Sequence, residues 1–94
     1  MSPASILVVE DDDDLRQTLA RRLSEAGYEV AMAATGPDAL AAVAESVPDL
    51  VVLDVMLPGL DGIEVCRRLR ADHPLLYILM LTARADELDR GVGL

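Results

Sequence analysis

The chain has 94 residues, enough for one small domain that buries roughly 60 to 65% of its unfolded surface. Apolar residues make up 52% and charged residues 27%, a globular composition that excludes an intrinsically disordered chain. Acidic residues outnumber basic ones by 17 to 8, every basic residue is arginine, and the formal net charge is -9. This acidity argues against direct nucleic-acid binding, which needs a basic face, and is compatible with cations and basic partners.

The cysteine content and the lengths of the apolar runs indicate the cellular compartment of the protein. Cys66 is the only cysteine, so no internal disulfide can form, and we expect a buried, inert thiol in a reducing cytoplasm. We expect no signal or transit segment before Ile6, and the longest apolar run, Leu75–Leu81, is too short to span a bilayer. The sequence therefore predicts a cytoplasmic domain without membrane contact.

The first part of the chain predicts a strand, a helix and a second strand. Ile6–Val9 is a continuous apolar run, typical of a strand buried on both faces. Asp12 and Asp13 are candidates for the N-cap of a helix that Gly27 would end. The apolar positions of this helix recur at helical spacing and are Leu15, Leu19, Leu23 and Ala26. Tyr28–Ala34 alternates less cleanly and predicts an outer strand.

A second helix and a central strand follow. Thr35 and Asp38 have the spacing of a capping box at a helix start. The residues expected on the inward face of this helix are Ala39, Leu40, Val43, Ala44 and Val47. Leu50–Asp54 is a short apolar run between Pro48 and a Pro-Gly turn at residues 58 and 59. It predicts a strand that is buried on both faces and ends on a carboxylate.

The last part of the chain predicts a third helix, a fourth strand and a short final helix. The apolar positions of the third helix are Ile63, Val65, Cys66 and Leu69. Late in this helix come three cations, Arg67, Arg68 and Arg70, which form either a solvated helix end or a docking patch. His73 and Pro74 end this helix, and we expect His73 to be a loop residue rather than a ligand. The strand Leu75–Leu81 follows, and Thr82 comes directly after it. Asp86 can cap a final helix that begins with Glu87–Arg90.

The alternation of strands and helices predicts an α/β domain. Short connections between them favour right-handed crossovers and a single parallel sheet. The strands Ile6–Val9 and Leu50–Asp54 are its natural centre. Ligands of open α/β sheets bind in the crevice beyond the carboxyl ends of such strands, so the residues that follow them are the candidates for chemistry.

Three carboxylates fall at these carboxyl ends. They are Glu10, Asp11 and Asp54. Adjacent strands lie about 4.8 Å apart, so the carboxylates should converge, and like charges at that distance repel unless a cation or a proton intervenes. Mg²⁺ prefers oxygen ligands and fits such a site, with the backbone carbonyl of Met56 as a further candidate ligand. The alternative for the acidic run Asp11–Asp14 is a solvated helix cap.

Asp54 is the candidate nucleophile. A carboxylate beside a metal can attack a phosphoryl group and form an aspartyl phosphate, with the metal offsetting charge on the phosphoryl oxygens. Thr82, at the end of the neighbouring strand, is placed to donate its hydroxyl to one of those oxygens. The structural alternatives are that Asp54 caps its loop and that Thr82 caps a loop or helix.

Three motifs together resemble the receiver domain of two-component response regulators. They are Ile6-Leu7-Val8-Val9-Glu10-Asp11, Asp54 with Pro58 and Gly62 at four and eight residues on, and Leu81-Thr82-Ala83. The resemblance extends from about Ile6 to Leu94. It implies a flavodoxin-like (CheY-like), doubly wound parallel sheet with the strand order 2-1-3-4-5.

The resemblance also implies roles for the candidate residues. Asp54 would be the phosphoacceptor, Thr82 the switch hydroxyl, and Glu10 and Asp11 would bind Mg²⁺ together with Asp54 and the Met56 carbonyl. The phosphoryl donor would be a phosphohistidine on a sensor histidine kinase. The stretch from Thr82 to the last residue resembles the class whose receivers precede a winged-helix DNA-binding output domain, which this chain does not contain.

The sequence departs from the family at its end. Receivers carry a fifth strand, a Lys at its end, an aromatic switch residue and a fifth helix, and the 94 residues stop before all of them. We therefore expect residues 1–94 to be an incomplete receiver domain with strand order 2-1-3-4, lacking the fifth strand and fifth helix. Phosphotransfer should be slower without the Lys. The fourth strand should be an exposed apolar edge, which predicts homodimers or larger self-association.

Two other functions compete with the phosphorylated switch. A phosphohydrolase that works through an aspartyl phosphate commonly needs an acid-base residue two positions after the nucleophile, and that residue is Met56, so no enzyme is expected. A self-associating interaction module that is never phosphorylated is favoured by the absent Lys. The complete set of Glu10, Asp11, Asp54 and Thr82 argues against that module.

Overall fold

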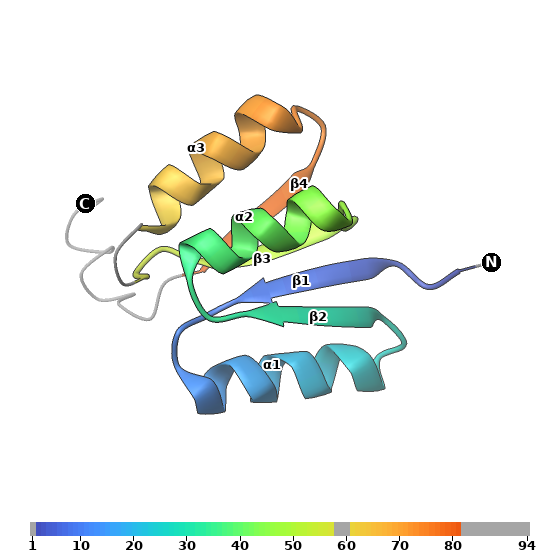
Figure 1. Ribbon diagram of the computed structural model, residues 1–94. Coiled ribbons are helices and arrows are strands. Elements are labelled where there is room, and N and C mark those ends of the chain that lie inside the picture. The colour runs from blue at the N-terminus through green and yellow to red at the C-terminus, as the bar shows by residue number, and fades with distance from the viewer. Residues whose placement is uncertain (1, 58–60, 82–94) are drawn as a thin grey trace, which may run out of the picture.

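Seven elements alternate along the chain in the computed structural model, which describes residues 2–57 and 61–81 (Figure 1). They are β1 (Ser5–Val9), α1 (Asp13–Glu25), β2 (Glu29–Ala33), α2 (Gly36–Glu45), β3 (Leu50–Asp54), α3 (Gly62–Asp72) and β4 (Tyr77–Leu81). The predicted order of strands and helices is confirmed over these residues. The predicted turn at residues 58 and 59, Thr82 and the final helix predicted from Asp86 lie outside the described residues.

The four strands form one parallel sheet in the order β2-β1-β3-β4. In the middle of the sheet Val8 pairs with Val52, and Val52 pairs with Leu79. β1 and β3 are central, as predicted, and are buried on both faces, whereas β2 is an edge strand that is exposed over most of its length. The flavodoxin-like, doubly wound order predicted for these four strands is confirmed.

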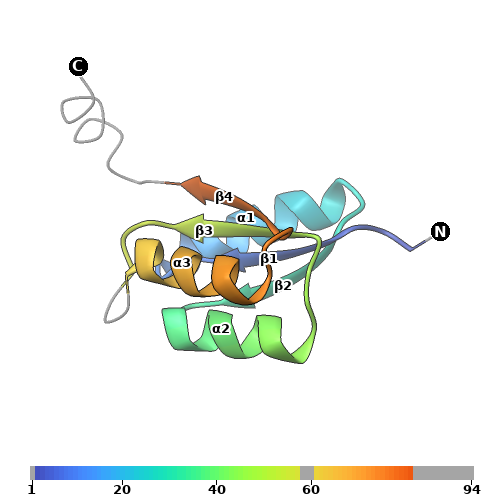
Figure 2. The same ribbon diagram turned by 90° about the horizontal axis from the view of Figure 1, so that it is seen from above.

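The helices cover the sheet from two sides. Figures 1 and 2 show α1 against one face and α2 with α3 against the other. Because side chains alternate along a strand, each face has its own core. The core under α2 and α3 contains Leu7, Val9, Ala39, Val43, Val51, Leu53, Val65 and Leu69. The core under α1 contains Ile6, Val8 and Val52, with Leu19 and Leu23 packed against it.

Each of the three helices begins at a side chain that caps it. Asp12 before α1, Thr35 before α2 and Asp61 before α3 each accept a hydrogen bond from the backbone N–H three residues on, at 2.9 to 3.2 Å. The caps at Asp12 and Thr35 are confirmed, and the cap at Asp61 was not predicted. Gly27 follows α1 with a φ of 102°, the left-handed conformation expected of a glycine that ends a helix.

Some apolar positions of all three predicted helices are exposed, and on α1 this holds for Leu15, which is 39% exposed. Ala44 is exposed, and Val47 is 52% exposed and lies beyond the end of α2, which stops because Ser46 takes extended backbone angles. Ile63 is 63% exposed. Val65 is fully buried and sets the inward side of α3, and a residue two positions earlier lies about 200° away around the helix.

The approach to β4 and the cysteine also differ from the prediction. Leu75, predicted as part of this strand, precedes it and is 92% exposed, because a turn closed by the Leu76 N–H and the His73 carbonyl delays the start of the strand. Cys66 is half-buried against the core under α2 and α3 rather than fully buried. None of the helices in the described part of the chain is long and apolar enough to cross a membrane.

Candidate functional site

Three carboxylates meet at the carboxyl end of the sheet. Glu10 and Asp11 directly follow β1, and Asp54 is the last residue of β3. Since Val9 pairs with Leu53, the residues after this pair lie next to each other on adjacent strands. One carboxylate oxygen from each of the three residues lies within 4.8 Å of the other two. The convergence predicted from the sequence is therefore present in the fold.

Two of these carboxylates are buried. Glu10 is 5% exposed and Asp54 is 4% exposed, whereas Asp11 faces solvent. The Asp12 N–H donates to Oε2 of Glu10 at 3.0 Å, and the Met56 N–H donates to Oδ1 of Asp54 at 3.0 Å. None of the ion pairs found in residues 2–57 and 61–81 involves either buried carboxylate. The N–H hydrogen bonds to the two buried carboxyl groups thus come from the backbone of the loops that follow the strands.

The pKa of Glu10 reflects its burial and the neighbouring carboxyl groups. The pKa of Glu10 is raised from 4.5 to about 7, mainly by burial and in addition by the neighbouring carboxyl groups of Asp54 and Asp11. The hydrogen bond from the Asp12 N–H opposes the rise. At neutral pH the cluster therefore has a strong tendency to take up positive charge, either a proton or a cation.

Gly62 brings the start of α3 against the backbone of the site. Its N–H donates to the Val55 carbonyl at 3.0 Å. A Cβ at this position would overlap the carbonyl oxygen of Asp54 and would lie 2.7 Å from the Cα of Val55. Only glycine permits this approach, so the glycine eight residues after Asp54 has a steric reason.

The structure gives partial information on two other predicted site residues. The side chain of Met56 is 47% exposed, and its backbone lies beside Asp54 through the N–H bond described above. A metal contact by its carbonyl stays a prediction. Thr82 is outside the described residues, but Leu81 pairs with Asp54 and its carbonyl accepts from the Val55 N–H at 2.9 Å. The end of β4 is thus adjacent to the end of β3.

Sequence reasoning missed Arg16. Its guanidinium donates to the backbone carbonyl of Glu10 at 2.9 Å and to the carboxylate of Asp13. The spacing of three residues between Asp13 and Arg16 was the only available signal, because the contact with Glu10 depends on how the loop folds back.

The arginines of α3 match the interpretation as a solvated helix end better than that of a docking patch. Arg67 and Arg68 are exposed and both bond to Glu64, and these bonds, led by the one from Arg67, lower the pKa of that carboxyl. Arg70 donates to the backbone carbonyls of Pro74 and Leu76 beyond the helix end.

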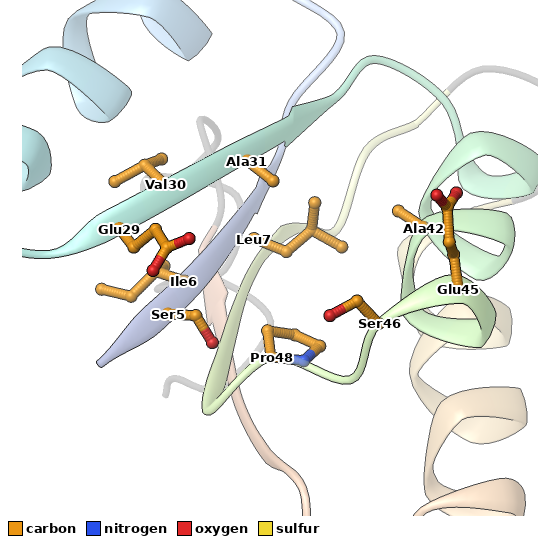
Figure 3. Close-up of a pocket in the computed structure, with 10 residues that line it drawn as sticks. All are labelled: Ser5, Ile6, Leu7, Glu29, Val30, Ala31, Ala42, Glu45, Ser46 and Pro48. Carbon is orange, nitrogen blue, oxygen red and sulfur yellow. The ribbon is translucent and has the colours of Figure 1, made fainter. Parts of the chain in front are cut away.

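A hollow of about 320 Å³ lies at the other end of the sheet (Figure 3). It is lined by residues from the starts of β1 and β2 and from the end of α2, among them Ser5, Glu29, Ala42 and Glu45. Its charged lining residues are both acidic. It is separate from the three-carboxylate cluster, which therefore remains the candidate site.

The family model of the response regulator receiver domain matches residues 6–94. The chain belongs to this family. The receiver domain is 53% identical over 90 residues to the transcriptional regulatory protein AfsQ1 of Streptomyces coelicolor, covering 96% of this chain and 40% of that protein. It is 48% identical over 89 residues to the alkaline phosphatase synthesis transcriptional regulatory protein PhoP of Bacillus subtilis, covering 95% and 37%. The chain thus spans about 40% of the length of these curated relatives.

Solved structures share the fold of this receiver domain. The response regulator TrrA of Thermotoga maritima, solved in complex with Mg(2+)-BeF, matches with a TM-score of 0.82 and 36% identity over 96% of this chain and 80% of that one. The chemotaxis protein CheY4 of Vibrio cholerae matches with a TM-score of 0.80 and 31% identity, covering 98% and 82%. The CheY-like fold class predicted from the sequence is confirmed.

Proposed function

We propose that this receiver domain is a phosphoacceptor switch of a two-component phosphorelay and that Asp54 receives the phosphoryl group. The observation that carries the proposal is the buried Asp54 at the end of β3, within 4.8 Å of the carboxylate oxygens of Glu10 and Asp11. The donor is a phosphohistidine of a sensor histidine kinase. An oxygen of Asp54 attacks phosphorus, the bond from phosphorus to the histidine nitrogen breaks, and the imidazole takes up a proton as it leaves.

The donor set fits Mg²⁺. Glu10, Asp11 and Asp54 each offer a carboxylate oxygen, a hard ligand, and these oxygens lie within 4.8 Å of one another. Within residues 2–57 and 61–81, no ion pair offsets the charge of the two buried carboxylates. Glu10, Asp11 and Asp54 would hold the ion, and the Met56 carbonyl is the further ligand we propose. When bound, the ion would offset negative charge on the phosphoryl oxygens. The related TrrA, solved with Mg(2+)-BeF, supports this assignment.

The residues around Asp54 have separate tasks in the transfer. The Met56 N–H donates to Oδ1 of Asp54 and so fixes the orientation of the attacking carboxylate. Burial of the carboxylate keeps bulk water away from the aspartyl phosphate. Thr82, next along the chain from β4, donates its hydroxyl to the phosphoryl group and so couples phosphorylation to a change in the loop and helix surface around it.

The output of the switch is transcriptional in this proposal. Relatives that match nearly the whole chain are named transcriptional regulatory proteins, and the chain spans about 40% of their length. We assign the output to a winged-helix DNA-binding domain of the longer protein and place the receiver in the cytoplasm. The acidic receiver itself, with a net charge of -9, would not contact DNA.

Intact-protein mass spectrometry after incubation with acetyl phosphate and Mg²⁺ tests the proposal. The parent chain should gain one phosphoryl group, and Asp54→Asn should gain none. Asp72→Asn, which changes an exposed carboxylate at the end of α3, is the matched control and should gain as much as the parent. A folded chain that gains nothing, or gains equally with Asp54→Asn, would refute phosphorylation at Asp54.

A second candidate function is self-association without phosphorylation. It is favoured by β4, the edge strand of the described sheet, on which Tyr77 is 75% exposed and Leu79 is 52% exposed. An apolar edge is a template for pairing with a second chain, which would give a homodimer or a larger assembly. Analytical ultracentrifugation over a dilution series decides this point, because a monomer that persists at high concentration would remove the candidate.

A further inference from the structure

Arg16 is the first arginine after the acidic residues 10–14, and most of its side chain is buried. Its side chain is 14% exposed, although it lies in the first turns of a surface helix. One end of the guanidinium donates to the Glu10 carbonyl at 2.9 Å and the other bonds to the Asp13 carboxylate. A planar guanidinium can hold two acceptors at fixed positions, which an ammonium group cannot reproduce.

The loop that Arg16 spans carries two of the three clustered carboxylates. The Glu10 N–H donates to the Ala33 carbonyl of β2 at 3.1 Å, and Oε2 of Glu10 accepts from the Asp12 N–H. Asp12 in turn caps α1. Arg16 supplies the remaining contact, on the carbonyl side of Glu10, so the backbone is held on both sides of this residue.

We propose that Arg16 is a positioning residue, which fixes the loop from Glu10 to Asp13 so that Glu10 and Asp11 present their oxygens to the cation bound with Asp54. The inference rests on the proposed function for the role of the cation, while the ordering of the loop can be measured without it. Arg16 bonds to a backbone carbonyl and to Asp13, and among the described residues its guanidinium forms no hydrogen bond with the clustered carboxylates. Its effect on the site therefore passes through the loop.

The test compares Arg16→Gln with Arg21→Gln, which removes an exposed arginine from the same helix. In the metal-free chain, amide hydrogen exchange at Asp12 and Leu15 should be about tenfold faster in Arg16→Gln, with the amides of β1 unchanged. Mg²⁺ affinity measured by calorimetry should fall by about tenfold, as is usual when a residue that orients metal ligands is lost. Arg21→Gln should change neither quantity.

Two further results decide between positioning and simple helix stabilisation. Arg16→Lys keeps the charge but cannot span both acceptors, so its Mg²⁺ affinity should lie between those of the parent and Arg16→Gln. If Arg16→Gln lowers the free energy of unfolding but leaves loop exchange and Mg²⁺ affinity as in Arg21→Gln, the inference is overturned. If the parent itself binds no Mg²⁺, the proposed function fails, and loop exchange alone decides whether Arg16 orders the loop.

Discussion

The two faces of the sheet are covered to different extents. On the face under α2 and α3, Val51 and Leu53 are fully buried, and the cover extends to β4 through Ile78 and Met80. The register places Tyr77 and Leu79 on the other face, beside Leu50 and Val52, and both are more than half exposed. In the described part of the chain, the core under α1 reaches β3 through Val52 but leaves these two side chains of β4 exposed. Within the described residues, one face thus has a closed apolar core over β3 and β4, whereas the other exposes apolar side chains on β4.

The largest expected effect contrasts one leucine from each face. Leu53→Ala should lower the free energy of unfolding by about 2 to 5 kcal/mol, because it leaves a cavity in a closed core. Leu79→Ala should lower it by only about 0.5 kcal/mol, since much of that side chain is already in water. Urea unfolding followed by circular dichroism measures both, as the chain has no tryptophan. Equal losses at the two positions would break the comparison.

The next effect concerns the sheet end, where the buried side chains are ionisable instead of apolar. Because the pKa of Glu10 is about 7 in the fold and 4.5 without it, the folded chain binds more protons than the unfolded chain between these values. The contribution of Glu10 to stability therefore falls as pH rises from 4.5 to 7, by at most about 3 kcal/mol.

Glu10→Gln removes the ionisable group and so isolates the pH-dependent contribution of Glu10 to stability. Urea unfolding of parent and variant in EDTA, at pH 5 and pH 8, should show the variant gaining stability relative to the parent at the higher pH. A stability difference between the two proteins that does not change with pH would show that Glu10 is not strained by burial and by its neighbours.

Substitution of Gly62 tests the close packing of the start of α3 against the backbone of Asp54 and Val55. Gly62→Ala should lower the free energy of unfolding by about 1 to 3 kcal/mol, because the added methyl group meets backbone atoms that cannot turn away. Phosphorylation of Asp54 should also slow, since the same contact moves its backbone. The neighbouring exposed position provides the control, and Ile63→Ala should be within about 0.5 kcal/mol of the parent.

The smallest effect on stability is expected on the open face, by which we mean the part of the sheet where Tyr77 and Leu79 of β4 are exposed. Leu79→Glu should change the free energy of unfolding by less than about 1 kcal/mol and should weaken self-association, because like charges would meet where two copies pair. Sedimentation velocity over a concentration series compares the variant with the parent. If the parent is monomeric throughout, the open face does not mediate association in this chain.

The sequence was sufficient for the features that depend on a repeating pattern. The apolar runs of β1 and β3 predicted central strands because residues buried on both faces tolerate almost no polar side chain. The convergence of Glu10, Asp11 and Asp54 followed from the parallel sheet, since all its strands end at the same edge. These predictions needed no knowledge of how individual side chains pack.

Features that depend on packing could not be read in this way. Ile63 and Val47 are as apolar as the buried residues around them, and only the phase and the length of their helices exclude them from the core. The contact of Arg16 with the Glu10 carbonyl requires the loop to fold back over the first turns of α1. The close approach of Gly62 to Asp54 is likewise a product of the fold.

The central claim is that three carboxylates from two strands act as one cation site that serves Asp54. Calorimetric titration with Mg²⁺ at pH 7, in buffers of different ionisation enthalpy, measures both the binding and the protons released. We predict one ion per chain, with release of roughly half a proton from Glu10, whose pKa is about 7, and loss of binding in Asp54→Asn. Absence of saturable binding, or binding that Asp54→Asn leaves unchanged, would contradict the claim.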